Sequence, residues 1–274
     1  MAKIADATLV IAVSLSLAAC VSPPIAADAD GQPAGVSDPI EPANRAIFDG
    51  NRFVDRNVAN PVAEAYRDNL PDGVRHAIHN SLSNLDEPVI GLNDALQGNF
   101  GRALVAVQRF AVNTTAGGVG VFDVASDWDL RHHDADFGQT LGVWGIGEGP
   151  YVELPFLGPS DARDAVGTLI GFVVNPFFLA GGSPAVSFAE AGISAGKMLD
   201  TRTNYLGTLD ALESTSVDYY ATLRSVYIQH RQALVAEGKS PEATYRGRVD
   251  VKFNGPDVPK LDNPDALSPN STEQ

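Results

Sequence analysis

The stretch "PDGVRHAIHNSLSNLDEPVIGLNDALQ", residues 71–97, indicates a helical fold. Its apolar residues recur at every third or fourth position: Val74, Ile78, Leu82, Leu85, Val89, Leu92 and Leu96. This period is that of one face of an α-helix, and polar residues such as His79 and Asn84 fall elsewhere. The stretch therefore predicts an amphipathic helix, kinked or broken at Pro88.

Two further segments have the same period. One begins near Asn99, with Phe100, Leu104, Val107 and Ala111 on one side and Arg102, Gln108, Arg109 and Asn113 away from it. The other runs from about Asp210 with Leu212, Tyr219, Leu223, Val226, His230 and Leu234 on one stripe. Gly238 is placed to end it. Because strand-like alternation is scarce outside 151–156, the sequence predicts a mainly α fold.

One segment is apolar nearly all round. It is "AVGTLIGFVVNPFFLAGG", residues 165–182, in which only Thr168 and Asn175 are polar. One interpretation is a core helix followed by a turn at Asn175-Pro176. The other is a helical hairpin that enters one leaflet of a membrane and returns, with Leu169, Phe172, Val173, Phe177 and Phe178 facing lipid. Composition does not decide between them.

The N-terminus is typical of a bacterial lipoprotein signal. The apolar run 7–19 is too short for a transmembrane helix and ends in "LAAC", which resembles a lipobox with Cys20 as the lipidated residue. The alternative is an ordinary signal peptide that happens to contain a cysteine. Since Cys20 is the only cysteine, no intramolecular disulfide is possible.

Composition divides the chain into four parts. Residues 1–19 are the predicted signal peptide, and 20–37, rich in Pro, Gly and Ala, form a predicted flexible tether. Residues 38–238 form a helical domain, and 239–274 form an acidic tail that we expect to be mostly disordered. The chain shows no internal repeat at a period of tens of residues.

The net charge of −15 restricts the partners. A chain this acidic is repelled by nucleic acid and by anionic lipid headgroups, so a nucleic-acid-binding function is not expected. Attachment to a membrane would depend on acyl chains and apolar surface instead.

The glycine-rich stretch "GVWGIGEGPYVELPFLGPSDARD", residues 142–164, lacks the motifs of common catalytic loops. No Gly-Lys-Ser/Thr follows its glycines, and the chain has neither a strand-to-helix GxGxxG nor a GxSxG motif. Ser160 is expected to cap a helix rather than act as a nucleophile. Glycines and prolines that fix the backbone indicate an architectural brace.

"RHHDADFG", residues 131–138, is the one cluster with the side chains of a metal site. These are His132, His133, Asp134 and Asp136. Adjacent histidines in a loop rarely converge on one ion, and no second ligand pair supports them. We therefore expect no metal, no other cofactor and no catalytic residues.

Colinear motifs over about 38–238 resemble the VacJ/MlaA family of outer-membrane lipoproteins. They are "DPIEPANR" (38–45), "NSLSNLDEPV" (80–89), "LQGNFGRA" (96–103), "RFAVNTTAGGVGVFDVA" (109–125), "DFGQTLGVWGIGEGPYVELPFLGPSDARD" (136–164) and "LRSVYIQHR" (223–231). Ala43 departs from the pattern, since many relatives have an aromatic residue after Glu-Pro.

The resemblance implies a ring of amphipathic helices in the periplasmic leaflet of the outer membrane, enclosing a channel. Through this channel, mislocalised phospholipids would pass from the outer leaflet toward a soluble periplasmic lipid carrier, with a trimeric porin holding the ring in place. This function belongs to the maintenance of lipid asymmetry.

The family pattern also implies roles for individual residues. Gly117, Gly118 and Gly120 would be hinges of a flexible hairpin beside the channel, with Asp123 following them. Asp161, Arg163 and Asp164 would begin a channel-lining helix. The alternative for Arg163 and Asp164 is a solvated helix end.

Two rival functions remain open. One is a hydrolase acting on lipids, with Ser160 or the His132/His133 pair at its centre. The other is a structural or adhesive surface lipoprotein that carries no lipid.

Overall fold

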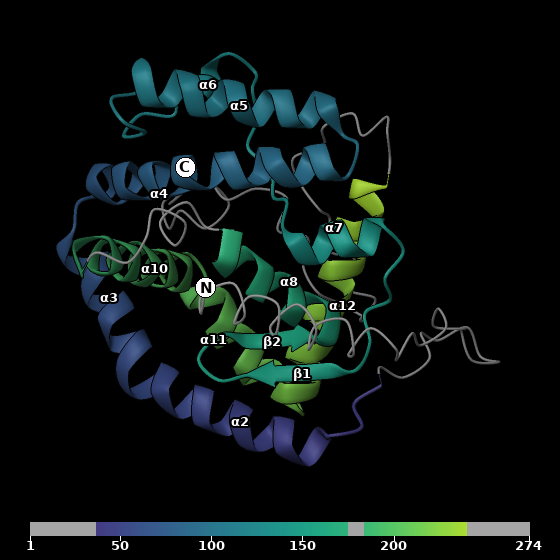
Figure 1. Ribbon diagram of the computed structural model, residues 1–274. Helices are drawn as coiled ribbons and strands as arrows, with labels where there is room; N and C mark the ends of the chain where they lie inside the picture. The colour runs from purple at the N-terminus through teal and green to yellow at the C-terminus, as the bar shows by residue number, and fades with distance from the viewer. Residues whose placement is uncertain (1–36, 175–183, 240–274) are drawn as a thin grey trace, which may run out of the picture.

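The computed structural model describes residues 37–174 and 184–239. Within them the fold is mainly helical, as predicted, with one two-stranded sheet (Figure 1). The signal peptide, Cys20, nearly all of the tether, Phe177, Phe178 and almost the whole C-terminal tail lie outside the described residues. No helix in the described ranges is both long and apolar enough to cross a membrane.

The chain first forms a long helical arc along one side of the molecule (Figure 1). It consists of α2 (Glu41–Val54), the π-helical segment η1 (Asp55–Ala59) and α3 (Asn60–Asn69). Pro61 has no backbone N–H, so the α-helical hydrogen-bond pattern loses a donor at this point, directly after the π-helical segment.

Helices α4 (Asp72–Leu96) and α5 (Phe100–Thr115) lie side by side and antiparallel at the top of the view (Figure 1). A Cβ built on Gly91 of α4 would lie 3.4 Å from Ala103 O and from Ala106 Cβ, so small residues allow close packing. Of the kink or break predicted at Pro88, the break is wrong, because α4 continues through this residue. Packing against α5 outweighs the one hydrogen bond that proline removes.

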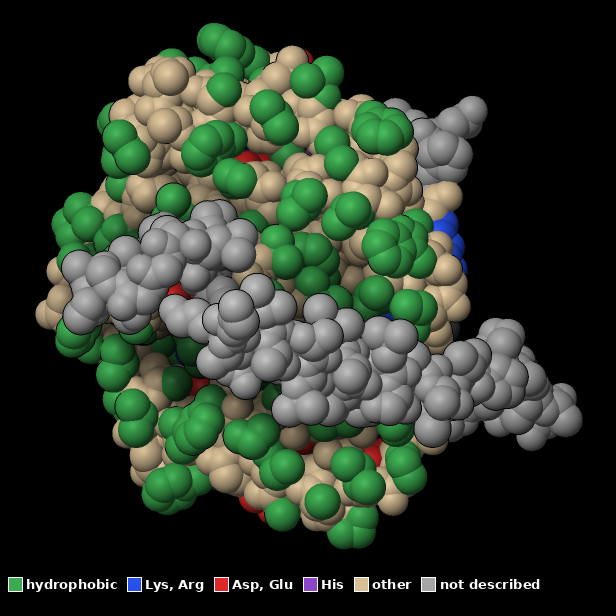
Figure 2. Space-filling model, viewed as in Figure 1, with side chains coloured by type: hydrophobic (Ala, Val, Ile, Leu, Met, Phe, Trp, Pro, Cys, Tyr) green, Lys and Arg blue, Asp and Glu red, His purple; other side chains and the backbone are tan. Residues whose placement is uncertain are grey.

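The apolar stripes of α4 and α5 face outward. Val74, Leu85, Leu92 and Leu96 of α4 and Phe100, Leu104 and Val107 of α5 are all exposed, whereas the buried positions include Asn84, Glu87, Asn93, Asp94, Arg102, Arg109 and Asn113. This is the reverse of a helix in a water-soluble protein. Figure 2 shows hydrophobic side chains gathered over both helices on the face that it presents.

Beyond the short α6 (Val124–Asp127) and α7 (Phe137–Val143), the glycine-rich stretch forms a hairpin. Strand β1 (Tyr151–Leu154) pairs antiparallel with β2 (Gly158–Asp161), in the register Tyr151↔Asp161 to Leu154↔Gly158. Sequence predicted only the first strand, because Gly158, Pro159 and Ser160 have low strand propensity.

Two asparagine side chains of α2 hold the free edge of β1. Asn44 donates to Tyr151 O at 3.1 Å and accepts from Glu153 N at 2.9 Å. Asn51 donates to Leu154 O at 2.9 Å and accepts from Phe156 N at 2.8 Å. Side-chain amides thus replace a third strand, which supports the predicted role of this stretch as a brace.

Helix α8 (Ala162–Val174) begins one residue later than expected, so Ser160 is not its N-cap. Instead Asp161 Oδ1 accepts a hydrogen bond from Asp164 N at 2.8 Å, which is N-cap geometry. Ser160 lies in β2 because pairing with Val152 keeps its backbone extended.

The remaining helices are α10 (Pro184–Asn204), α11 (Leu206–Thr215) and α12 (Tyr219–Gly238). The single helix predicted from about Asp210 is therefore two. Asp218 divides them, because its side chain accepts from Ala221 N at 3.1 Å and starts a new helix. Gly238 ends α12, as predicted.

A small aromatic core joins α2, β1 and α12. Phe48 packs edge-on against Tyr220 with ring centroids 5.4 Å apart, and Tyr151 contacts Tyr220 at 5.9 Å. This core fixes the hairpin between the first and last helices of the described domain.

Candidate functional site

Charged side chains fill the space behind α4 and α5. Buried Arg109 of α5 pairs with Glu87 of α4 and, at 3.0 Å, with Asp123. His132 Nδ1 lies 3.0 Å from Glu87 Oε1. Burial alone would lower the pKa of His132, but hydrogen bonds to Asp134 and Glu87 outweigh it and raise the pKa to about 9. The loop before α7 is thus tied to α4 by a charged imidazolium.

A second buried group lies further along the same two helices. Arg102 contacts Asp94 at 3.4 Å and Glu237 of α12 at 2.9 Å, and His133 Nε2 lies 2.6 Å from Asp94 Oδ2. The two histidines therefore contact different carboxylates. In residues 37–174 and 184–239, no three His, Cys, Asp or Glu side chains group so as to hold a metal ion.

A third charged group lies at a cavity of about 270 Å³ between α7, β2, α8 and α12, which we call the polar cavity. Asp136, Asp164 and Arg231 of this group line it. Arg231 of α12 binds Asp136 through two hydrogen bonds, at 2.6 and 2.9 Å, and also pairs with Asp164. Tyr227 donates to Asp164 at 2.6 Å. Arg163 contacts Asp164 at 2.9 Å and Asp161 at 3.3 Å.

The two acids of this group differ in ionisation. Burial, and then the neighbouring Asp164 carboxylate, raise the pKa of Asp161 to about 7. Burial also acts to raise the pKa of Asp164, but Arg231 and Arg163 outweigh it and hold that pKa below its usual range. Below about pH 7 the pair therefore keeps a proton on Asp161 while Asp164 is charged.

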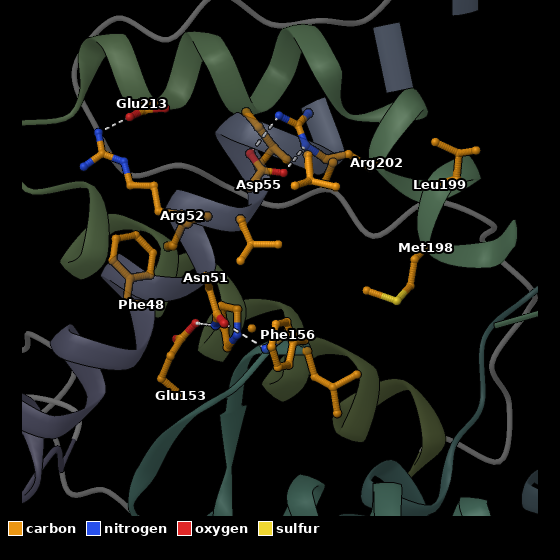
Figure 3. Close-up of a pocket in the computed structure, with 18 of the residues that line it drawn as sticks. Phe48, Asn51, Arg52, Asp55, Glu153, Phe156, Met198, Leu199, Arg202 and Glu213 are labelled. Carbon is orange, nitrogen blue, oxygen red and sulfur yellow. Dashed lines mark hydrogen bonds and ion pairs between the residues drawn. The ribbon is translucent and has the colours of Figure 1, made fainter. Parts of the chain in front are cut away.

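A larger cavity of about 540 Å³, which we call the apolar cavity, lies on the other side of the hairpin. Its walls come from α2, η1 and α3, the hairpin turn, α10, α11 and the start of α12 (Figure 3). Most of its lining is apolar, with Arg52, Asp55, Arg202, Asp210 and Glu213 among the exceptions. Pro159 of β2 lines both cavities, so this strand is the wall between them.

The structure brings three of the predicted site residues together. Asp161, Arg163 and Asp164 are all buried and bonded to one another, so they do not form a solvated helix end. Asp123 belongs to the Arg109 group instead, where it caps α6. Burial would raise the pKa of Asp123, but hydrogen bonds from Ser126 and Asn113 and the charge of Arg109 lower it.

The predicted hinge glycines lie in the loop between α5 and α6. Gly118 and Gly120 have φ of +63° and +86°, and a Cβ on Gly120 would lie 2.8 Å from Asn84 Cβ. Gly120 N donates to Asn113 O at 2.8 Å and Phe122 N to Gly117 O at 2.9 Å. The loop is closed by hydrogen bonds and packed against α4, and its motion stays a prediction.

Of the residues predicted to face lipid, Leu169, Phe172 and Val173 can be placed. They are 63, 51 and 49% exposed on α8, so these three do not form a core. Buried Arg163, Asp164 and Gly167 belong to the opposite, inward face of the same helix.

Sequence reasoning missed the charged partners from distant helices, above all Glu87, Arg202, Glu213 and Arg231. One signal was available, since Arg102, Arg109 and Asn113 recur at helical spacing and mark the inward face of α5. Their partners depend on tertiary contacts, which no local pattern indicates.

Comparison with known proteins gives concordant matches. The family profile described as "MlaA lipoprotein" matches residues 36–234. The chain is 35% identical over 212 residues to the "Intermembrane phospholipid transport system lipoprotein MlaA" of Escherichia coli, covering 74% of this chain and 80% of that protein. An uncharacterised protein of Rickettsia bellii is 34% identical over 206 residues, covering 75 and 79%.

A solved structure has the same fold. It comes from work titled "Structural basis for maintenance of bacterial outer membrane lipid asymmetry", and the two chains superpose with a TM-score of 0.64 at 34% identity. The match covers 73% of this chain and 99% of the solved one.

Proposed function

This chain belongs to the MlaA lipoprotein family, and we propose that it takes part in phospholipid transport at the outer membrane of a Gram-negative bacterium. Relatives whose names state a function are named as components of an intermembrane phospholipid transport system.

The observation that carries the proposal is the reversed polarity of α4 and α5. Their apolar side chains face outward, while Glu87, Asp94, Arg102 and Arg109 face the interior. In water, exposing this apolar surface is unfavourable in free energy. Against lipid acyl chains, the same apolar surface contacts apolar groups and this penalty is absent. The exposed Leu169, Phe172 and Val173 of α8 extend the argument to a second part of the surface.

The finer parts of the proposal concern position and path. The domain at 38–238 would lie in the periplasmic leaflet, held by the lipidated Cys20 that follows the signal peptide at 1–19 and by a trimeric porin. Phospholipid would pass beside Asp161, Arg163 and Asp164, with Gly117, Gly118 and Gly120 as hinges, toward a soluble periplasmic carrier. Residues 20–37 would be the tether and 239–274 a disordered tail.

We propose no catalytic role for any residue. The Ser160 hydroxyl is buried and donates to Asp161 O at 3.3 Å. His132 and His133 are each engaged by a carboxylate of α4. Fatty acid released from phosphatidylethanolamine by the purified protein would favour the hydrolase instead.

The test is complementation of a Gram-negative strain that lacks its own family member. Phospholipid amines in the outer leaflet are labelled on intact cells with an impermeant reagent. The wild-type chain should lower the labelling, whereas Thr168→Trp, which fills the polar cavity, should not. Leu104→Trp on the outward face of α5 is the matched control and should behave as wild type.

Protein amounts are matched by immunoblot. If the wild-type chain left outer-leaflet phospholipid unchanged at that level, the transport proposal would be wrong. Equal clearance by Thr168→Trp would remove the polar cavity from the path.

A further inference from the structure

We propose that the apolar cavity is a binding site for one acyl chain of a zwitterionic phospholipid, with the headgroup held by the charged residues at its rim. The inference rests on the proposed function and adds a site to it, separate from the polar cavity. Its volume of about 540 Å³ lies within the roughly 300–1,000 Å³ typical of ligand pockets.

The lining of the cavity calls for an apolar occupant. Val58, Val62, Phe156, Leu157 and Met198 all line it, and each is 48% exposed or more. In Figure 3, Met198 points from α10 into the space and Phe156 lies on the hairpin side. These side chains leave the cavity between their helices and the hairpin unfilled. An alkyl chain bound there would bury the apolar side-chain surface that is now exposed.

The rim supplies donors for a phosphate. Arg52 and Arg56 share Glu213, and Arg202 donates to Asp55 at 2.7 and 3.1 Å and to Asn60 at 2.9 Å. Arg52 Nε and Arg202 Nη1 are buried with no hydrogen-bond acceptor among the described residues. Buried guanidinium N–H groups without acceptors are costly, and phosphate oxygens satisfy such groups well.

The charged residues at the rim favour a headgroup that has both a positive and a negative charge. Three guanidinium groups, of Arg52, Arg56 and Arg202, stand with three carboxylates, of Asp55, Asp210 and Glu213. Because these charges already cancel, a purely anionic headgroup would add a net negative charge beside three carboxylates, whereas an ammonium group next to the phosphate keeps the cluster neutral. Phosphatidylethanolamine has that chemistry.

The cavity is open to a direct test with photo-crosslinking. The probe is phosphatidylethanolamine with a diazirine near the end of one acyl chain, added to the full-length lipidated protein in nonionic detergent. Mass spectrometry of peptides should place the label at 54–62 and 195–199. Met198→Trp, which fills the space, should reduce that label about tenfold, as expected for a site whose affinity falls by one decade. Leu104→Trp is the control for an added indole and should not reduce it.

A second variant tests the rim without risk to folding. Arg56 does not line the cavity itself but pairs with Glu213, which does, and its side chain is 56% exposed. Arg56→Gln should therefore leave thermal unfolding unchanged while lowering label by several-fold. Unlabelled phosphatidylethanolamine should compete with the probe far better than oleate or inorganic phosphate. Equal competition by oleate would overturn the headgroup assignment.

Label that stays on the outward faces of α4 and α5, or that Met198→Trp does not reduce, would overturn the site. The complementation assay is read separately. A protein that binds probe in this cavity but fails to clear the outer leaflet would overturn the transport proposal and leave the site standing.

Discussion

At the scale of single residues, the interior of this protein depends on paired charges. Arg109 is 2% exposed and Glu87 is fully buried, and each has a second charged partner, Asp123 and His132 respectively. Removing two charges from water costs free energy, which good geometry and further hydrogen bonds offset. Such pairs add little net stability, but breaking one is expensive.

The first prediction follows from this asymmetry. Arg109→Met leaves the Glu87 carboxylate buried with only His132 as a charged partner, so the free energy of unfolding should fall by about 3–5 kcal/mol. The double variant Glu87→Gln with Arg109→Met should recover part of that loss. Urea unfolding in detergent measures the stability of both variants. The control is Arg56→Gln, which removes a solvent-exposed ion pair and should change the free energy of unfolding by less than about 1 kcal/mol. No loss in Arg109→Met would contradict a buried ion pair.

A second prediction concerns pH. The pKa of Asp161 is raised to about 7 in the folded protein, mainly by burial, from 3.8 in the unfolded chain. The folded state therefore binds the proton more tightly, and stability falls as pH rises from about 4 to about 7. Asp161→Asn keeps an oxygen to cap α8 and removes this ionisation. Its melting temperature should match wild type near pH 4 and exceed it at pH 8.

A melting temperature of Asp161→Asn below wild type at pH 8 would show that the charged carboxylate stabilises the fold.

His132 affects stability in a different pH range. Since its pKa rises from 6.5 to about 9 on folding, its stabilisation is complete below about pH 6.5 and is lost as pH rises through 9. The Asp161→Asn protein should keep that upper decline.

At the scale of elements, helices α4, α5 and α8 have an apolar outer face and a polar inner one. The third prediction tests what the outer face contacts. Leu104→Asp on α5 places a charge on that face, which costs about 2.5–3.5 kcal/mol at the centre of a bilayer. Membrane association should drop while folding in detergent is kept. Gln229→Asp, at an exposed polar site on α12, should leave flotation with membranes unchanged.

Helix packing gives the fourth prediction. A Cβ on Gly167 of α8 would lie 2.3 Å from Gly138 N of α7, so Gly167→Ala must push two backbones apart. We expect a loss of about 1–3 kcal/mol in the free energy of unfolding. Gly50→Ala in α2 is the matched control, because nothing lies within 4 Å of a Cβ built on Gly50. Alanine there should stabilise the helix by about 0.5–1 kcal/mol relative to glycine. If the two variants unfolded alike, the close contact between α7 and α8 would be in doubt.

At the scale of the whole molecule, the net charge of −15 opposes adsorption to anionic lipid, so attachment needs the apolar face and an anchor. The fifth prediction is that Cys20→Ala, which removes the only residue able to form the thioether, yields an uncleaved precursor without lipid-linked mass. Intact mass and fractionation measure this. A Cys20→Ala protein that still reached the outer membrane unacylated would show that the surface of the domain suffices.

The sequence by itself determined the mainly helical class and the family. The 3.6-residue period gave the start of α5 nearly to the residue, because helix formation depends on neighbours three and four positions apart, and Gly238 marked the end of α12. Colinear motifs identified the family. Strand β2 and the N-cap at Asp161 were not predicted. A strand forms by pairing with another strand, and an N-cap can be assigned only once the first residue of the helix is known.

Only the tertiary structure decided which way each amphipathic helix faces. In α5 the apolar stripe of Phe100, Leu104 and Val107 and the polar stripe of Arg and Asn have the same period, and local sequence does not tell which one is buried. The polar stripe is buried because carboxylates distant in the chain, such as Glu87 and Asp123, pair with its guanidinium groups inside the protein. Which stripe faces outward also depends on whether the surroundings are water or acyl chains. The two cavities likewise exist only because β2, held by Asn44 and Asn51 through β1, stands between helices that are far apart in the chain.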